Sequence, residues 1–456
     1  MGLTDLQHRA GRPVDARSLA VVRIAFGLVI VWEAYRYWVN GWIESIWLTP
    51  AYHVPYDGFT WLAPLPGHGL YGVWLGIAVC GALIAAGRAY RPAAAVLVLL
   101  FGYVFLLERT RYLNHFYLMI LLAGILAVVP ADRVWSVGKS SGIRTVPTWA
   151  LWLVRFQVAV MYVGGAVAKL NGDWLAGRPL DQWLASNTDL ALVGPLLDEV
   201  WAGRVFAWAG LGLDLLIVPA LFWRPTRVAA LVAAGAFHLL NSKLFQIGVF
   251  PPLAMAATTV LLPPDWPATT ARGVRSRLAR AWSGGVVDRA QGPQPEIPGR
   301  PDQPVSALLL GLVGLYAAIQ VVVPLRHLVL PGDPSWTEAG HTFAWHMKLR
   351  DKDADIAYTV TDPSHDDVWV PDLNEYLQPW QRVRVAADPG MIVRFAQHLG
   401  SDARDRGIAE PVVYANAVVS LNGRPAVPLI DTSVDLLDLG DPQDAVMPHP
   451  DEQLAR

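Results

Sequence analysis

The sequence predicts an all-α, polytopic membrane helix bundle of about nine spans, which carries a small extracytoplasmic α+β or β-sandwich-like C-terminal domain. Hydrophobic residues make up 54% of the 456 residues and charged residues only 16%, whereas soluble globular chains carry about 25% charged residues. The 20 tryptophans add to this indication, because Trp favours membrane interfaces. After about residue 330 the long apolar runs give way to alternating, strand-like segments.

Nine apolar stretches are candidates for spans, because a spanning helix needs roughly 20 apolar residues. They belong to a bundle predicted over residues 18–330, which follows an N-terminal segment at 1–17 and contains a cytoplasmic linker at 264–304. Within this linker, residues 283–304 are rich in Gly, Pro and polar residues and predict a flexible loop. The candidate spans lie at about 18–38, 69–87, 92–107, 112–129, 149–168, 204–223, 227–242, 247–263 and 305–325.

The distribution of Arg and Lys agrees with nine spans. Five basic segments fall on one side of the membrane if there are nine, and positive charge favours the cytoplasmic side. The chain is therefore predicted to be a multi-pass protein of a cytoplasmic membrane, with its N-terminus in the cytoplasm and its C-terminal domain outside. The basic segments are the N-terminus, 87–91, 131–148, 223–227 and the 264–304 linker.

A β-rich domain is predicted outside the membrane over residues 331–440. Residues 341–351, 355–362 and 367–370 alternate and carry β-branched and aromatic side chains, as strands do. Residues 411–431 contain Asn422-Gly423, a strong hairpin signal. Residues 389–407 predict one helix over this sheet, and 441–456 a flexible tail.

Polar residues gather at the predicted outer ends of three spans. Ionisable groups within spans are costly and by default mark a functional site. Because segments far apart in sequence bring such residues to a similar depth, we expect one site at the outer face. They are Asn114 and His115 at the start of the fourth span, Lys169 at the end of the fifth, and His238, Asn241 and Lys243 at the end of the seventh.

Each of these residues also has a structural explanation. Lys169 alone could extend its amine to the membrane interface. His238 and Asn241 could form interhelical hydrogen bonds, and Asn114 and His115 could be ordinary interface residues. Three charged residues that lie deeper or nearer the inner side are predicted to form buried ion pairs or inner anchors: Arg23, Arg155 and Asp214.

Several other classes of site are excluded. The chain has no GxxxxGK[ST], HExxH, GxSxG or CxxC motif. No metal is predicted, because His115 and His238 have no carboxylate or thiol at a suitable spacing. Cys80 is the single cysteine, so no intrachain disulfide can form. A net charge of −2 gives no indication of nucleic-acid binding.

A lysine at the apolar end of a helix can do proton chemistry. Burial favours the neutral form of an amine, and a neutral amine can act as a general base. Small residues at 164–168 are expected to let neighbouring helices pack closely around Lys169. A site that opens to lipid suits a lipid-soluble, weakly acidic phenol such as a hydroquinone. The residues alone thus predict a membrane enzyme or binder with an amine base at its outer face.

Four blocks of this sequence, in this order, resemble the vitamin K-dependent γ-glutamyl carboxylase family of horizontally transferred transmembrane domain proteins. They are "ERTRYLNHFYLMILL" (108–122), "MYVGGAVAKLNGDWLAG" (161–177), "FHLLNSKLFQIGVFP" (237–251) and "PLRHLVLPGDPSWTEAGHTFAWHMKLRDK" (324–352). The resemblance implies a membrane helix bundle with an outer β-containing domain. The Ala- and Arg-rich composition with basic inner loops is typical of a bacterial member.

The resemblance also implies a chemistry, that of a lyase. A base deprotonates reduced vitamin K, a hydroquinone such as menaquinol, whose anion reacts with O₂ to give a much stronger base. That base removes a γ-proton from a peptide glutamate, CO₂ adds, and vitamin K epoxide is released. In this sequence the matching base is Lys169, and Asn114 and His115 would hold and polarise the quinone oxygens, with His115 counted as catalytic. His238, Asn241 and Lys243 match a further block at the quinone pocket.

The implied partners are the lipid bilayer, the quinone and a glutamate-containing peptide, with O₂ and CO₂ as co-substrates, and no nucleic acid. Two other functions stay open. The first is a hydroquinone epoxidase that carboxylates nothing. The second is a quinone- or lipid-binding membrane scaffold without catalytic turnover.

The predicted topology can be tested with reporter fusions. A fusion at about residue 290 is expected to report the cytoplasm and a fusion at the C-terminus the opposite compartment, because the basic segments share one side. Two fusions in the same compartment would show that the number of spans is wrong.

Overall fold

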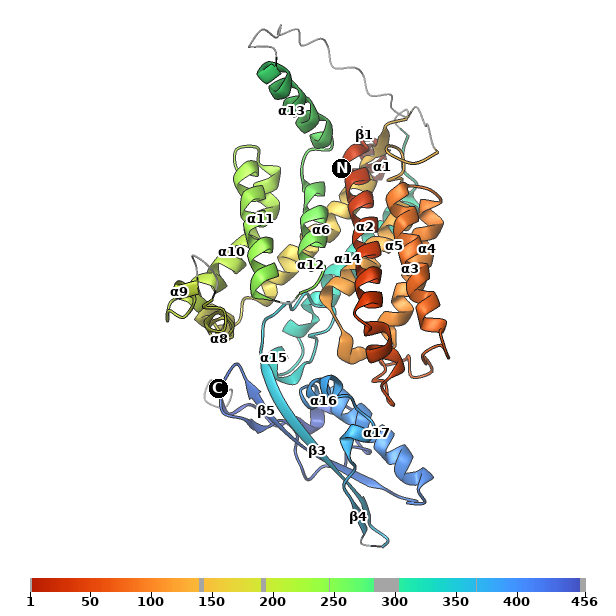
Figure 1. Cartoon of the computed structure of the whole chain (residues 1–456), viewed down its shortest axis with the longest axis vertical. Helices are drawn as coiled ribbons and strands as arrows, with labels where there is room; N and C mark the ends of the chain where they lie inside the picture. Colours follow the sequence, from red (N-terminus) through yellow and green to blue (C-terminus); the bar gives the residue numbers. More distant parts are fainter. Residues whose placement is uncertain are drawn as a thin grey trace.

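The chain forms an elongated molecule with a helix bundle at one end and an α+β domain at the other (Figure 1). The computed structural model describes residues 2–138, 143–189, 194–245, 247–282, 303–365 and 367–451, without the side chains of 279–282. We call the end of the bundle next to the C-terminal domain its outer end and the opposite end its inner end.

Each predicted span contains a helix in the part of the chain that the structure describes. Five of these helices are long and apolar enough to cross a membrane, namely α2, α3, α6, α10 and α14, and α4, α5 and α12 are shorter. The count of nine spans therefore stays a prediction. The helices are α2 (Arg17–Val39), α3 (Gly69–Ala86), α4 (Tyr90–Leu106), α5 (Asn114–Val128), α6 (Thr148–Ala168), α10 (Ala202–Phe222), α11 (Arg227–Leu244), α12 (Phe250–Thr258), which continues into η3 (Thr259–Leu261), and α14 (Ala307–Leu325).

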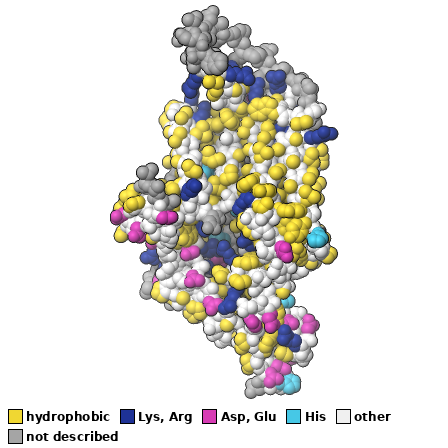
Figure 2. Space-filling view, viewed as in Figure 1, with side chains coloured by type: hydrophobic (Ala, Val, Ile, Leu, Met, Phe, Trp, Pro, Cys, Tyr) yellow, Lys and Arg dark blue, Asp and Glu magenta, His cyan; other side chains and the backbone are white. Residues whose placement is uncertain are grey.

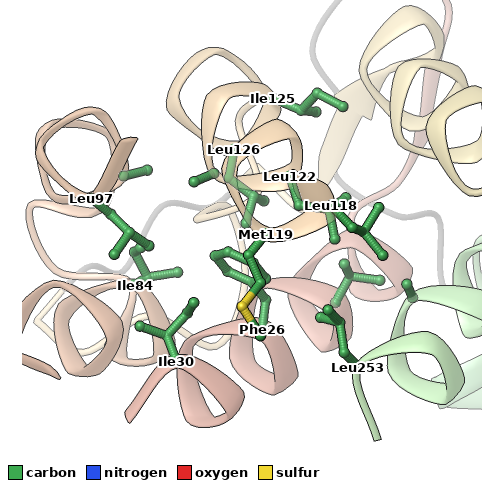
Figure 3. Close-up of a cluster of buried hydrophobic side chains, with 14 of the residues drawn as sticks. Phe26, Ile30, Ile84, Leu97, Leu118, Met119, Leu122, Ile125, Leu126 and Leu253 are labelled. Carbon is green, nitrogen blue, oxygen red and sulfur yellow. The ribbon is translucent and has the colours of Figure 1, made fainter. Parts of the chain in front are cut away.

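Helices α2 to α5 pack into one apolar core. Phe26 of α2 lies against Met119 of α5, and Ile30 of α2 lies on the side of Ile84 of α3 (Figure 3). Helix α2 can approach α3 closely because Gly27 has no side chain: a Cβ there would lie 2.5 Å from the Gly81 carbonyl oxygen. Small residues at a crossing are the usual device for close packing in apolar surroundings, where burial alone gives little driving force.

The inner end carries the short elements that the sequence did not predict. Strand β1 (Pro13–Asp15) pairs antiparallel with β2 (Thr145–Pro147), beside α1 (Leu3–Gly11). Helix α13 (Trp266–Trp282) occupies the first part of the predicted 264–304 linker, whereas residues 283–302 lie outside the described residues. Figure 2 shows Lys and Arg gathered at this inner end, above a hydrophobic band. This is the distribution on which the predicted orientation rests, and the orientation itself stays a prediction.

Short helices that connect α6 to α10 lie at the outer end (Figure 1). The first begins where Asn171 Oδ1 accepts a hydrogen bond from the Trp174 amide at 2.9 Å, a typical N-cap. These helices are α7 (Gly172–Ala176), α8 (Leu180–Ala185) and α9 (Gly194–Leu197). Short π or 3₁₀ turns elsewhere are η1 (Glu44–Leu48), η2 (Arg109–Arg111), η4 (Arg326–Leu328), η5 (Leu373–Glu375) and η6 (Pro442–Ala445).

The C-terminal domain is built on one antiparallel sheet in the order β4-β3-β5-β6. The long strands β3 and β5 pair from Lys352 opposite Leu421 to Thr361 opposite Val412. The strands are β3 (Lys352–Asp362), β4 (Asp367–Trp369), β5 (Val412–Leu421) and β6 (Val427–Pro428). Helices α16 (Pro379–Ala386) and α17 (Pro389–Asp405) pack against this sheet. The described residues thus form an α+β domain, and the sandwich-like alternative is not seen.

Two local predictions for this domain are confirmed. Helix α17 matches the helix predicted at 389–407. Asn422 and Gly423 have φ angles of 53° and 73°, and two consecutive left-handed residues are what a type I′ hairpin turn requires. The turn is also fixed from outside, because Asn422 Oδ1 accepts a hydrogen bond from the Asp351 amide at 2.8 Å.

The predicted flexible tail at 441–456 is wrong for residues 441–451, while 452–456 lie outside the described residues. Ala445 is 1% exposed. The Met447 amide donates to the Leu429 carbonyl at 2.9 Å, and the Met447 carbonyl accepts from Trp336 Nε1 at 2.7 Å. Trp336 lies in α15 (Pro334–Thr337). Backbone pairing and a buried indole therefore hold this segment, although its polar sequence resembles that of a loose terminus.

The strand predicted at 341–351 is also wrong. Residues 338–351, which we call the inserted segment, form a series of turns that enters the outer end of the bundle. Glu338, Phe343, Trp345 and Lys348 all have φ angles between 53° and 62°, a left-handed conformation that is uncommon for residues other than Gly. Trp345 is 1% exposed within the core of the helix bundle. Contacts with the helices, rather than pairing in a sheet, explain the alternation of apolar residues here.

Direct contacts also join the C-terminal domain to α7, the short helix that follows α6. Arg424, just after the hairpin turn, binds Asp173 of α7 through both carboxylate oxygens at 2.5 and 2.7 Å. Asn422 Nδ2 donates to the same carboxylate at 2.6 Å. A bidentate guanidinium–carboxylate pair fixes relative orientation as well as distance. The domain is thus anchored four residues after Lys169.

Gly164 is predicted to be required for the inserted segment to dock. A Cβ at Gly164 would lie 2.6 Å from Trp345 Cδ1, so Gly164→Ala should lower the thermal unfolding midpoint, since overpacking typically costs about 1–3 kcal/mol. Gly124→Ala in α5 is the matched control, because no neighbour lies within 4 Å of its added Cβ and the gain in helix propensity is the same. Thermal unfolding in detergent would measure both. Equal midpoints for the two variants would contradict the docking described here.

Candidate functional site

A cavity of about 1330 Å³ opens at the outer end of the bundle. Its wall combines residues of α2, α5, α6, α10 and α11 with residues of the inserted segment and α16. Figure 2 shows the face hollowed at this level, with Lys and Arg side chains in the hollow. Pockets for small ligands usually measure about 300–1,000 Å³, so the cavity is large enough for a bicyclic ring and part of an attached chain.

The structure brings five of the six predicted site residues to this cavity. The exception is Lys243, which is exposed on α11 and is not among the lining residues. The five predicted residues that line the cavity are Asn114, His115, Lys169, His238 and Asn241. The reasoning from equal depth thus found side chains that line one cavity, although it could not decide which way each of them points.

Lys169 turns its amine into the bundle. It follows the last residue of α6, and side chains of a helix lean toward its N-terminus. Nζ therefore lies back along α6, where it donates to the Gly165 carbonyl at 3.3 Å and to Asp214 Oδ2 at 2.6 Å. The residue is only 5% exposed. The structural explanation for Lys169 required its amine to extend to the membrane interface, and the amine does not do so.

Asp214 is the site residue that the sequence reasoning missed. It was predicted to be a buried ion pair or inner anchor, and it is a buried ion pair, but its partner is Lys169. Gly165 leaves the room for this pair, because a Cβ there would lie 3.2 Å from Asp214 Oδ2 and 3.7 Å from Lys169 Nζ. The signal that could have found it was a carboxylate in the middle of an apolar span.

Arg23 and Arg155 have the structural role that was predicted for them. Arg23 donates to the Trp135 carbonyl at 2.7 Å and to Ser136 Oγ at 3.1 Å. Arg155 donates to the carbonyls of Val260 and Leu262 at 2.8 and 2.7 Å. Both side chains act as anchors to backbone groups, and neither lines the cavity.

His238 presents a hydrogen-bond acceptor to the cavity. Thr258 donates its hydroxyl proton to the Ala254 carbonyl at 2.7 Å, so Tyr162 must donate to Thr258 across 2.7 Å. With its own proton used, Tyr162 accepts from His238 Nε2 at 3.0 Å. A neutral imidazole carries one proton, which leaves Nδ1 of this buried histidine unprotonated. That atom has no partner among the described residues.

Asn114 and His115 stand at the start of α5, against the inserted segment. Asn114 Nδ2 donates to the His346 carbonyl at 3.0 Å, and its Oδ1 accepts from the Tyr112 hydroxyl at 3.0 Å. Both polar atoms of the Asn114 side chain are thus hydrogen-bonded to other parts of the protein. His115 is buried beside the ring of Phe250. Of the two predicted quinone contacts, His115 has the freer side chain.

The inserted segment adds charged groups that the sequence reasoning did not assign to the site. Glu338 binds Arg350 Nε at 2.6 Å and Lys352 Nζ at 2.8 Å. Burial by itself raises the pKa of a carboxyl, but Arg350 and Lys352 together hold the pKa of Glu338 well below its usual value. Glu338 is therefore an anion that neutralises two cations of the cavity wall.

Three other cations of the wall form no ion pair with a carboxylate of the described residues. Arg111, Lys348 and Arg384 line the cavity, and none of the three forms an ion pair with a described residue. Lys348 instead lies over the Trp183 ring, 4.9 Å from its centroid, and Arg111 lies over Trp380 at 5.6 Å. Uncompensated positive charge attracts anionic ligands to such an opening.

Within the described residues, no group of three or more His, Cys, Asp or Glu could hold a metal ion.

Two family models match the chain. The model of the HTTM domain matches residues 11–266. The model of the lumenal domain of vitamin K-dependent gamma-carboxylase matches residues 305–452. The first match covers most of the bundle, and the second covers α14, the inserted segment and the sheet. No solved structure matches the chain.

The buried pair predicts a distinctive pattern of stability. Lys169→Met and Asp214→Leu should each lower the unfolding midpoint strongly, because removing one partner of a buried pair costs about 3–5 kcal/mol. The double variant should recover most of this loss, since it leaves no unpaired charge. Thermal unfolding of the three variants in nanodiscs would measure this coupling. Losses that simply add in the double variant would show that the two residues are energetically independent.

Proposed function

The chain belongs to the vitamin K-dependent gamma-carboxylase family, and on that premise we propose that it oxygenates a reduced naphthoquinone to its epoxide and carboxylates peptide glutamate with CO₂. The observation that carries the proposal is the amine of Lys169, buried in the wall of a large cavity at the outer end of the bundle. An amine held away from water can exchange a proton with a phenol. Lys169 is accordingly the proposed base.

The residues of the cavity fit a quinone ring. Tyr37, Met161, Phe237 and Phe250 supply apolar and aromatic surface to its wall, and His238 Nδ1 is a buried polar atom for which the described part of the chain offers no partner. Leaving such an atom unpaired costs about 1–3 kcal/mol, so a ligand hydroxyl that donates to it is a favourable occupant. When bound, reduced vitamin K would supply the strong base that forms on reaction with O₂ and removes the γ-proton of glutamate.

Asp214 gives Lys169 a way to become a base. An ammonium cannot accept a proton, so the proton on Nζ must leave first. It can move across the 2.6 Å hydrogen bond to Asp214 Oδ2, which turns an ion pair into a neutral amine and a carboxylic acid. Burial favours this neutral form, because it removes two charges from apolar surroundings. The neutral amine then takes a proton from the hydroxyl of the bound hydroquinone.

The other cavity residues receive complementary roles. In the proposal, His238 orients the ring through the hydrogen bond to Nδ1, while His115 and Asn241 contact it from neighbouring helices. Asn114 acts on the ring through the inserted segment that it holds. Lys243, exposed and outside the lining, has no contact with the ring in this arrangement. The cations of the cavity wall that form no ion pair within the described residues would attract an acidic peptide.

One assay tests the function as a whole. The purified full chain in nanodiscs is supplied with reduced vitamin K, O₂, ¹⁴CO₂ and a glutamate-containing peptide, and epoxide and carboxylated peptide are both quantified. Both products are expected. Epoxide without carboxylated peptide would support the epoxidase alternative, and the absence of both products would support a non-catalytic scaffold.

Substitutions of Lys169 test its role as the base. Lys169→Ala is expected to abolish epoxidation and carboxylation together, because both follow from one deprotonation. Lys169→Arg should fail as well, since a guanidinium stays charged and cannot take a proton. Raising the pH should partly rescue Lys169→Ala, because hydroxide can then ionise the hydroquinone.

A matched control is Lys243→Ala, a second lysine at the outer end of a helix that does not line the cavity. Its epoxidation rate is expected to equal that of the unchanged chain. Near-normal epoxidation by Lys169→Arg would make the general-base role untenable.

A further inference from the structure

His346 occupies a defined place in the cavity wall. It is 6% exposed and belongs to the inserted segment. Its carbonyl accepts from Asn114 Nδ2 at 3.0 Å. The two flanking side chains reach α6: a Cβ at Gly164 would lie 2.6 Å from Trp345 Cδ1, and a Cβ at Gly165 would lie 3.3 Å from Met347 Cε. His346 thus stands between two residues that contact α6 close to Lys169.

A chain of hydrogen bonds fixes where the proton of His346 resides. Arg350 Nη1 lies 3.0 Å from His341 Nε2, and a guanidinium can only donate. His341 Nε2 is therefore unprotonated, and the proton of that ring is on Nδ1. His341 Nδ1 lies 3.1 Å from His346 Nδ1, to which it must donate. His346 consequently carries its own proton on Nε2.

Both histidines are neutral in this arrangement. Burial, together with the positive charge of Arg350, holds the pKa of His341 well below its usual value. Burial, and then the neighbouring His327, lowers the pKa of His346 to about 3. The tautomers therefore follow from the fixed charge of Arg350, which is in turn held by Glu338. The carboxylate and the guanidinium set the direction of every hydrogen bond that follows.

The chain of hydrogen bonds ends at an unused donor. His346 Nε2 is buried and has no hydrogen-bond partner among the described residues, although His346 lines the cavity. Its ring meets that of His327 edge-on, with centroids 4.6 Å apart. A buried N–H without an acceptor is unfavourable. An oxygen of a bound ligand would satisfy it.

We propose that His346 is a quinone-binding residue, whose Nε2–H donates a hydrogen bond to a ring oxygen of the bound naphthoquinone. This inference rests on the proposed function. The quinone oxygen is favoured over a glutamate carboxylate because Asn114 holds the His346 carbonyl and because Trp345 and Met347, on either side of His346, pack in the apolar core of the bundle. His238 and His346 then offer opposite contacts, an acceptor at Nδ1 and a donor at Nε2.

The direct test uses oxidised 2-methyl-1,4-naphthoquinone as the probe, bound to the purified full chain in nanodiscs. Isotope-edited infrared spectra should show one carbonyl stretch lowered in frequency by the hydrogen bond. His346→Leu should lose this shift and weaken binding about tenfold, the size of one hydrogen bond of about 1.4 kcal/mol. His346→Gln keeps a donor near Nε2 and should retain much of both.

His365→Leu is the matched control, because His365 lies in the turn between β3 and β4 and is not among the cavity residues. It should leave the carbonyl spectrum and the affinity unchanged. A second measurement does not depend on the folding of His346→Leu: ¹⁵N spectra of histidine-labelled protein, assigned with His346→Gln, should show His346 protonated at Nε2.

The outcomes separate this inference from the function on which it rests. Unchanged affinity and carbonyl spectrum in His346→Leu, or protonation of His346 at Nδ1, would overturn the inference, while epoxide formation by the unchanged chain would leave the function standing. Binding of the probe without epoxide formation would overturn the function and leave the hydrogen bond standing, whereas failure of the unchanged chain both to bind the probe and to form epoxide would overturn both.

Discussion

The ion pair between Lys169 and Asp214 is the constraint around which the outer half of this molecule is arranged. Two opposite charges in an apolar bundle are tolerated only when they meet with good geometry, and here Nζ and Oδ2 lie 2.6 Å apart. This requires α6 and α10 to face each other at these two residues and requires Gly165 to leave room between them. A single pair thus determines the helix contact, the local composition of α6 and one wall of the cavity.

The C-terminal domain completes this wall, so the cavity belongs to neither part of the chain alone. Trp345 fills the space that Gly164 leaves on α6, and Asp173 binds Arg424 just beyond Lys169. Both contacts lie within five residues of the lysine. Displacement of the domain would therefore open the cavity to water beside the residues of the proposed proton transfer, which links the docking of the domain to the chemistry.

Reasoning from the sequence succeeded where one local rule decides the structure. Apolar length predicted the helices, and Asn422-Gly423 predicted a turn with two left-handed residues. It failed where two rules give the same pattern. Phe343, Trp345 and Met347 alternate as in a strand, but they alternate because the inserted segment lies between helices. The argument from equal depth in the membrane predicted that Lys169 and His238 belong to one site. It could not predict the pair of Lys169 with Asp214, because that pair depends on how α6 and α10 are rotated and on the inward direction of the lysine side chain.

The direction of the hydrogen bonds determines which ring nitrogens in the cavity are donors and which are acceptors. Neither the depth of the residues nor the composition of the chain predicts this. Thr258 and Tyr162 leave His238 with an acceptor, whereas Arg350 and His341 leave His346 with a donor. A quinone can accept from His346 but cannot donate to His238, because its oxygens carry no protons. A hydroquinone can do both. In the proposed function, the two fixed tautomers therefore favour the reduced ring over its oxidised form, and this preference comes from an arginine and a threonine that need not touch the ring.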